Sequence, residues 1–322
     1  MPPRLHEEIY QSTECLVEQL DKLDQLGLQL TPGAQKIDYN TVIFDDCIIM
    51  KLNLKNSTSF EGVCDDEYIY FCVPRENTEI KVNGFNLSFR ELYILAPGSE
   101  IKAIFPDNFV GFYLGINKKN LIQLLGEKSV DILLEQRERI YSGKFKFIEI
   151  EIFKNNLISS ITYLLEKYST LNEVSKLDIK DNILRSLKVL HNNNSIIISQ
   201  NQGLNKSLAV TKRATNYIKN CTDSYISVIE LCKNSYCSIR TLEYAFKRIY
   251  GISPKRYLMI RRLNFIRTDI LTKRPKYLTP LLSNHGVVNL GRFSNDYYRF
   301  FGEYPKDTLK ILNNQQPMKK LV

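Results

Sequence analysis

The stretch Ser238–Pro254, which reads SIRTLEYAFKRIYGISP, decides the fold of the last third of the chain. Ser238 is a residue type whose hydroxyl caps helix N-termini, and Gly251 is the type that ends helices in a left-handed conformation. The pattern therefore predicts a helix over 239–250. Ahead of it, Ile226–Asn234 reads as a shorter helix, and the three residues between the two read as a turn. The segment is thus predicted to be a helix-turn-helix unit.

One face of the predicted helix 239–250 is apolar. Its residues recur every three or four positions, which is typical of a face packed into a core. The opposite face is polar and basic, and such a face fits the major groove of duplex DNA, which is about 12 Å wide. The predicted core residues of this helix are Ile239, Leu242, Phe246 and Ile249.

A long helix is predicted to follow the first unit. Ser253 supplies an N-cap and Pro254 suits the first helical position, so the helix is expected to run to about Leu271. Eighteen residues at 1.5 Å each span roughly 27 Å. A rigid connection of this length suits two reading helices on successive major-groove faces, which recur every ~34 Å along the duplex. Its predicted apolar face comprises Met259, Leu263, Ile266 and Ile270.

The helix-turn-helix pattern then occurs a second time. A short helix is predicted over Leu278–His285, and the stretch 285–305, HGVVNLGRFSNDYYRFFGEYP, continues through a turn into a helix over 290–301. Gly302 ends that helix, and Pro305 opens a last one. The predicted apolar face of the second reading helix comprises Leu290, Phe293, Tyr297 and Phe300 or Phe301.

The charge of the chain is concentrated in this same region. The net charge of the whole chain is +9, but residues 207–310 hold 19 Lys and Arg against 7 Asp and Glu, whereas residues 1–206 hold 23 against 28. An electrostatic field guides a polyanion only if it is concentrated on one part of the surface. The uneven distribution therefore favours a nucleic-acid partner for 207–310 over a uniformly solvated basic surface.

Both units and the connecting helix resemble, in order, the DNA-binding domain of the AraC/XylS family of transcription regulators. RTLEYAF in the first unit and LGRFSNDYYRFFGEYP in the second are most similar to the ethanolamine-utilisation regulators of that family. The resemblance implies a sequence-specific double-stranded DNA-binding regulator, an activator, and covers about a hundred residues. It rests on the segments 238–242, 246–248, 251–254, 261–264 and 266–267, together with Gly286, Phe293, Phe301, Gly302 and Pro305.

The resemblance also implies which side chains contact DNA. Arg292 is the best candidate for guanine and Asn295 for adenine, because these side chains form bidentate hydrogen bonds to the edges of those bases. Val287 departs from the family, which usually has Phe there, and the nearby Leu281 and Leu282 stand where small residues are common. The implied base contacts are Arg240, Glu243, Tyr244, Gly291, Arg292 and Asn295, and the implied phosphate contacts are Thr241, Lys247, Arg248 and Arg299.

The first two hundred residues show a different pattern. From Tyr39 to Ile116 apolar and polar residues alternate, which predicts short strands of a jelly-roll or cupin-like barrel, and helices are expected after Asn117. The fold class is therefore α+β with two domains. The predicted boundaries are 1–191 for the β-rich sensing or dimerisation domain with helices, 192–206 for a linker, 207–310 for the all-α DNA-binding domain and 311–322 for a tail.

Two alternatives to a regulator stay open for this chain. A cupin-type enzyme or effector domain could be fused to the DNA-targeting module, or the basic helices could bind proteins. Cupin chemistry needs several converging histidines, and none occurs between His6 and His191. We therefore expect no enzyme activity, catalytic residue, cofactor or metal. The barrel is better interpreted as a sensor, with a candidate effector pocket formed by Tyr68, Tyr70, Phe105, Phe109 and Tyr113.

The spacing of the cysteines and the hydropathy of the chain predict where the protein works and which partners it has. The seven cysteines are scattered without a CxxC pair, which favours reduced thiols and a cytoplasmic location, and Cys232 and Cys237 are expected to pack in the core. No apolar run approaches the roughly 18 residues needed to cross a bilayer, so no membrane partner is expected. The expected partners are promoter DNA, RNA polymerase, a small-molecule effector and a second copy of the chain.

Overall fold

The N-terminal region forms two antiparallel sheets. The computed structural model describes residues 2–13, 16, 26–75, 78–87, 92–134, 147–192, 202–221 and 226–313. The first sheet has the order β1 (Arg4–Tyr10), β3 (Ile37–Ile43), β4 (Cys47–Leu54), β11 (Phe109–Asn117), β6 (Tyr68–Pro74) and β9 (Tyr93–Leu95). The second has the order β2 (Leu26–Gln29), β5 (Thr58–Val63), β10 (Glu100–Phe105), β7 (Ile80–Val82) and β8 (Phe85–Leu87).

A core of apolar side chains from both sheets lies between them. Leu52 and Leu54 of β4, Phe60 of β5 and Phe105 of β10 belong to this core. The alternation seen in the sequence places these residues on one side of each strand. Asn83 and Gly84 both have positive φ in the turn between β7 and β8, as an Asn-Gly hairpin requires.

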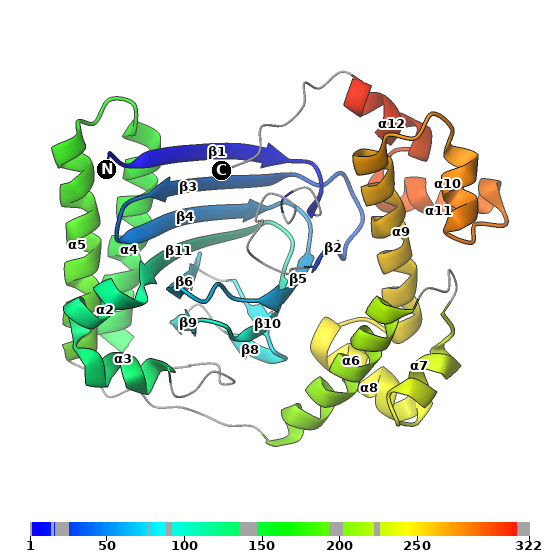
Figure 1. Ribbon diagram of the computed structural model, residues 1–322, viewed down its shortest axis with the longest axis horizontal. Helices are drawn as coiled ribbons and strands as arrows, with labels where there is room; N and C mark the ends of the chain where they lie inside the picture. The colour runs from blue at the N-terminus through cyan, green and yellow to red at the C-terminus, as the bar shows by residue number, and fades with distance from the viewer. Residues whose placement is uncertain are drawn as a thin grey trace.

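Helices cover the outer face of the first sheet. They are α2 (Lys118–Leu125), α3 (Glu127–Leu134), α4 (Phe147–Lys167) and α5 (Glu173–Asn192). Ile49 of β4 and Leu114 of β11 pack there with Phe153 of α4 and Leu187 of α5 in a second buried cluster. Figure 1 shows α4 and α5 paired at one side of the sheets, with α2 and α3 next to them.

The C-terminal region is all helical. It comprises α6 (Gln202–Asn220), α7 (Val228–Asn234), α8 (Ile239–Tyr250), α9 (Pro254–Lys273), α10 (Leu278–Asn284), α11 (Leu290–Phe301) and α12 (Pro305–Asn313). The predicted fold class, a β-rich N-terminal region with helices and a helical region with two helix-turn-helix units joined by a long helix, is confirmed. α6 begins inside the stretch predicted as a linker.

The N-caps of α8 and α9 and the glycines that end α8 and α11 are those expected from the sequence. The Ser238 hydroxyl accepts a hydrogen bond from the backbone N–H of Thr241, and the Ser253 hydroxyl accepts one from Arg256. Gly251 and Gly302 end α8 and α11 in the left-handed conformation. Because each cap satisfies polar groups at a helix end, local sequence alone places the ends of these helices.

The prediction of a core position is wrong for three residues. Ile239 and Leu290 are 52% and 41% exposed, because each is the first residue of its helix and lies ahead of the turn that meets the core. Met259 is 44% exposed, since α9 instead buries Tyr257 and Ile260. The strands β1 and β2, which precede the alternating region, were also missed by the sequence pattern.

Candidate nucleic-acid interface

The first helix-turn-helix unit is built on an aromatic cluster. The rings of Phe246 and Tyr250 on α8 have centroids 5.3 Å apart, and Tyr257 of α9 lies 5.3 Å from the first and 4.6 Å from the second. All three side chains are buried, and burial raises the pKa of both tyrosines. This cluster fixes α8 on the start of α9 and turns its polar face outward.

The predicted DNA-contacting residues of α8 lie on that outward face. Arg240, Glu243 and Tyr244 are exposed, as is Lys247. Arg248 is half-buried, and its guanidinium donates a hydrogen bond to the Tyr244 hydroxyl at 3.2 Å. The structure therefore brings Arg248 beside a predicted base contact. Thr241, the remaining predicted phosphate contact, is half-buried beside the N-cap.

The second unit presents a corresponding face on α11. Gly291, Arg292, Asn295 and Arg299 are all exposed. The Asn289 side chain caps the helix by accepting a hydrogen bond from the backbone N–H of Arg292 at 2.9 Å. The three predicted base contacts are thus on the first two turns of a capped helix, the part that reaches base edges in a major groove.

The core of the second unit accommodates the three residues that differ from the usual family pattern. Val287 is buried, as are Leu281 and Leu282 of α10, and all three join the cluster that holds Phe293 and Tyr297. The branched and apolar side chains at these positions fill the space beneath the turn. The second unit therefore keeps the helix-turn-helix arrangement despite the departure.

A buried cation that the sequence pattern missed lies at the base of the second unit. Arg267 of α9 is 5% exposed, and its guanidinium donates to the carboxylate of Glu303 at 2.5 Å and lies 4.6 Å from the centre of the Phe301 ring. Tyr297 and Thr308 complete the group through a hydroxyl–hydroxyl bond of 2.9 Å. Burial raises the pKa of Tyr297 to about 12. The sequence does contain a signal for this buried cation, because Arg267 lies three residues before Ile270 and so falls on the predicted apolar face of the helix.

The turn of the second unit is tied to α9 by a carboxylate. Asp269 accepts hydrogen bonds from His285 Nε2 and Lys273 Nζ, each at 2.7 Å, while Arg262 donates to the backbone carbonyl of His285 at 2.8 Å. Burial raises the pKa of Asp269, but the bonds from Lys273 and His285 outweigh it, so that the pKa lies below its ordinary value of 3.8. The ionised carboxylate is therefore the form that stabilises the folded turn.

This arrangement predicts a pH dependence of stability. Because the pKa of Asp269 is lower in the folded state, its contribution is present above the unfolded pKa of 3.8 and is lost as pH falls through the folded value. We expect the difference in free energy of unfolding between the wild type and Asp269→Asn to shrink as the pH falls below about 5, through the unfolded pKa of 3.8 and on through the lower folded pKa. Urea titrations over this range measure it. A difference that is constant with pH would contradict the assignment.

The predicted effector-pocket residues lie in or beside the core between the sheets. Phe105 and Phe109 are buried with ring centroids 4.5 Å apart, and Tyr70 and Tyr113 pack against the same core. Tyr68 is half-buried, and its ring lies 6.2 Å from that of Tyr70. These five aromatic residues are spread along β6, β10 and β11, because Phe109 begins β11 and Tyr68 pairs with Asn117 at its end.

The part of the chain that the structure describes contains neither a metal-binding cluster nor a membrane-spanning helix. Within those residues, no three His, Cys, Asp or Glu side chains gather closely enough to hold a metal ion. Cys232 is buried in the core of the first unit and Cys237 packs against it, as expected. None of the described helices is both long and apolar enough to span a membrane.

Comparison with known proteins places the helical region. Residues 231–311 match the family model described as a helix-turn-helix domain. The XylDLEGF operon transcriptional activator of Pseudomonas putida is 31% identical over 101 residues, which are 31% of this chain and 32% of the relative. The probable thc operon regulatory protein of Rhodococcus erythropolis is 27% identical over 105 residues, 32% of each chain. Both matches thus span less than two thirds of the relative.

Solved structures extend over more of the chain at lower similarity. The AraC-like transcriptional activator CuxR is 13% identical, with 82% of this chain and 96% of that chain covered and a TM-score of 0.41. ToxT from Vibrio cholerae is 10% identical, with 98% and 100% covered and a TM-score of 0.31. The comparisons thus show a helix-turn-helix domain over residues 231–311, and this part of the chain is similar to the corresponding part of operon regulators of transcription.

Proposed function

We propose that the protein is a sequence-specific regulator that binds double-stranded promoter DNA, acts as an activator and works in the cytoplasm. In this proposal α8 and α11 enter successive major-groove faces. The observation that supports it most is the placement of all six predicted base contacts, which are exposed on the first halves of two capped helices. They are Arg240, Glu243, Tyr244, Gly291, Arg292 and Asn295.

The charge of the region supports a duplex partner. Lysines and arginines outnumber acidic residues by 19 to 7 over residues 207–310. Exposed cations near the reading helices, such as Lys247 and Arg299, suit phosphates because ion pairs with the backbone supply sequence-independent affinity. Base-edge contacts then supply the specificity.

Substitutions at two cations test the division of roles. We expect Arg292→Ala to weaken binding by about 1–3 kcal/mol on the selected operator and to relax specificity at one base pair, because a bidentate contact to guanine is lost. Lys247→Ala should weaken all duplexes alike and lower the slope of log K against log salt by about one, since it removes one phosphate contact. Fluorescence anisotropy with operator and random duplexes over a salt series measures both.

The same titrations separate the proposed function from its alternative. The operator is first selected by the wild-type protein from a random duplex library. If the wild type binds selected and random duplexes equally, the protein-interaction alternative is favoured. If Arg292→Ala loses affinity equally on both, the assignment of Arg292 to a base is wrong.

The N-terminal region supplies sensing and dimerisation in this proposal. The buried rings of Phe105 and Phe109 and the partly buried rings of Tyr68, Tyr70 and Tyr113 support an effector site in the barrel. The exposed groove between α4 and α5, which includes Tyr163 and Val189, supports contact with a second copy. RNA polymerase completes the set of proposed partners. We place the domain boundary between the end of α5 and the start of α6, within the stretch 192–206 that the sequence predicts as a linker.

A further inference from the structure

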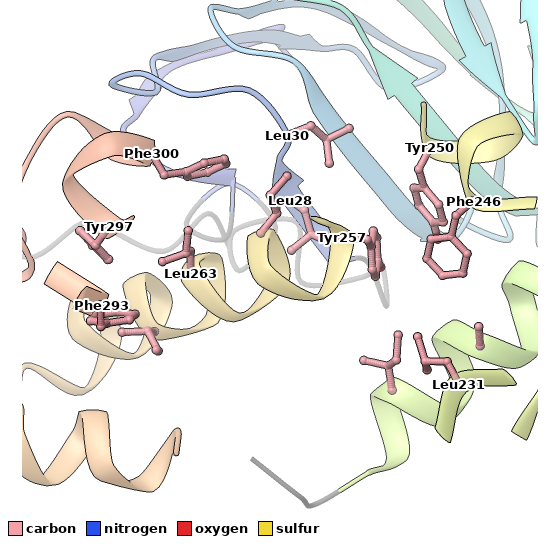
Figure 2. Close-up of a cluster of buried hydrophobic side chains, with 14 of the residues drawn as sticks. Leu28, Leu30, Leu231, Phe246, Tyr250, Tyr257, Leu263, Phe293, Tyr297 and Phe300 are labelled. Carbon is pink, nitrogen blue, oxygen red and sulfur yellow. The ribbon is translucent and has the colours of Figure 1, made fainter. Parts of the chain in front are cut away.

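The barrel contributes directly to the core of the DNA-binding region. Leu28 of β2 and Leu30 just after it are 0% and 4% exposed, and they belong to the same buried cluster as Leu263 of α9. Figure 2 shows Leu28 and Leu30 over α9, between the side chains of the first unit and those of the second. The middle of the connecting helix is therefore covered by the barrel.

A side chain of α9 completes the open edge of β2. β2 is the terminal strand of its sheet, and among the strands that the structure describes only β5 pairs with it. Asn264 supplies the missing partner: its Oδ1 accepts from the Gln29 backbone N–H at 3.1 Å, and its Nδ2 donates to the Gln29 carbonyl at 3.2 Å. Asn264 is 1% exposed, so this pairing is shielded from water. A few residues later, the Gly33 N–H donates to the carbonyl of Phe300 at the end of α11.

A separate contact holds the end of α8. The Tyr250 hydroxyl donates to Glu61 of β5 at 2.5 Å and accepts from Lys102 of β10 at 2.6 Å. The side chains of Lys102 and Glu61 also form an ion pair at 3.3 Å. Lys81 of β7 donates to the carbonyl of Arg248 at 3.4 Å. The first unit is thus held by β5, β10 and β7, whereas the second is held by β2 and the loop after it.

The two contacts have a joint consequence for the reading helices. β2, β5, β10 and β7 are hydrogen-bonded neighbours, so one sheet holds both units at a set distance. The contacts use α9 and the ends of α8 and α11, and they leave the exposed faces with Arg240 and Arg292 uncovered. The barrel therefore does not compete with DNA for the predicted reading surfaces.

We propose that this sheet is a brace that sets the spacing of the two half-sites that the protein reads, with Asn264 and Tyr250 as its positioning residues. The inference rests on the proposed DNA-binding function. Without the brace, α9 alone connects the units, and bending of this long helix allows them to reach half-sites at other distances. Each added base pair shifts the second half-site by about 3.4 Å and turns it around the duplex axis, so a rigid pair of units tolerates such insertions poorly.

The test compares spacing variants of one operator with the full-length protein. The operator selected by the wild type is remade with one, two or three base pairs inserted between its half-sites, and dissociation constants are measured on each duplex. The penalty for insertion is the ratio of the dissociation constant on the lengthened operator to that on the original operator. We expect this ratio to fall by about five- to tenfold in Asn264→Ala. A looser connection lowers the effective concentration of the second unit at its half-site for the original spacing, but keeps it for the other spacings. Tyr250→Phe, which keeps the ring and removes only the hydroxyl, should act in the same direction.

The control is Thr272→Ala on the same helix, whose side chain is exposed and bonds only to the carbonyl of Thr268. It should keep the wild-type spacing penalty. If Asn264→Ala and Tyr250→Phe lose affinity uniformly on all spacings, or gain affinity on all of them, the sheet does not set the half-site spacing and the proposal is wrong. A wild-type protein that enriches no sequence would overturn the proposed function itself, and the brace with it.

Discussion

Arg267→Ala is expected to lower the free energy of unfolding by about 3–5 kcal/mol, because it leaves the carboxylate of Glu303 in a largely buried site without its cation. The side chains of Arg267 and Glu303 are 6% and 21% exposed, so water compensates little for the lost ion pair. The substitution also removes the guanidinium from the face of Phe301 and from the Tyr297 hydroxyl. The second helix-turn-helix unit should loosen first.

Urea denaturation followed by circular dichroism measures this loss, and the control is Arg256→Ala. Arg256 is the same residue type on the same helix, but it is exposed. Its replacement should change the free energy of unfolding by no more than about 0.5 kcal/mol. Replacing both partners, as in Arg267→Met with Glu303→Gln, should restore part of the loss, since no charge then stays buried. A midpoint for Arg267→Ala equal to that of the wild type would show that the pair is not structural.

Phe246→Ala should lower the free energy of unfolding by about 3–5 kcal/mol, through loss of a buried ring and the cavity left behind. Phe246 is fully buried, and its ring contacts those of Tyr250 and Tyr257. Both units therefore depend on aromatic packing, and the second adds a buried ion pair to it. Thermal and urea unfolding measure the effect.

Ile239→Ala is the matched control on the same helix. The sequence pattern placed Ile239 on the same apolar face as Phe246, but the structure leaves it 52% exposed. Its replacement is expected to cost under about 0.5 kcal/mol. Equal losses for the two variants would mean that the start of α8 is packed after all.

The candidate site was largely predictable because its determinants are local. Helix caps, left-handed glycines and the spacing of three or four residues act within a few positions of one another, so α8 and α11 begin and end where the sequence indicates. The polar residues between the apolar positions face outward for the same reason. The exposed positions of Arg240 and Arg292 follow from this geometry.

The errors came from contacts between distant segments. The apolar pattern could not show that α9 buries Asn264 and Arg267. A buried polar side chain needs a hydrogen-bond partner, and both partners come from distant segments. Asn264 bonds to the backbone of Gln29, and Arg267 bonds to Glu303. A polar residue on a predicted core face is ambiguous until its partner is known. β2 was missed for a related reason, since a four-residue strand with few alternating positions gives little periodic signal.

The sequence by itself thus determined the helix-turn-helix units, the long helix between them, the β-rich character of the N-terminal region and the polar residues that α8 and α11 expose. All of these depend on local chain geometry. Only the tertiary structure decided how the two units are held relative to each other. That arrangement depends on Leu28, Asn264 and Tyr250 meeting partners that are more than a hundred residues away in the chain. Hydrogen bonds and apolar contacts between such distant segments leave no periodic signal in the sequence.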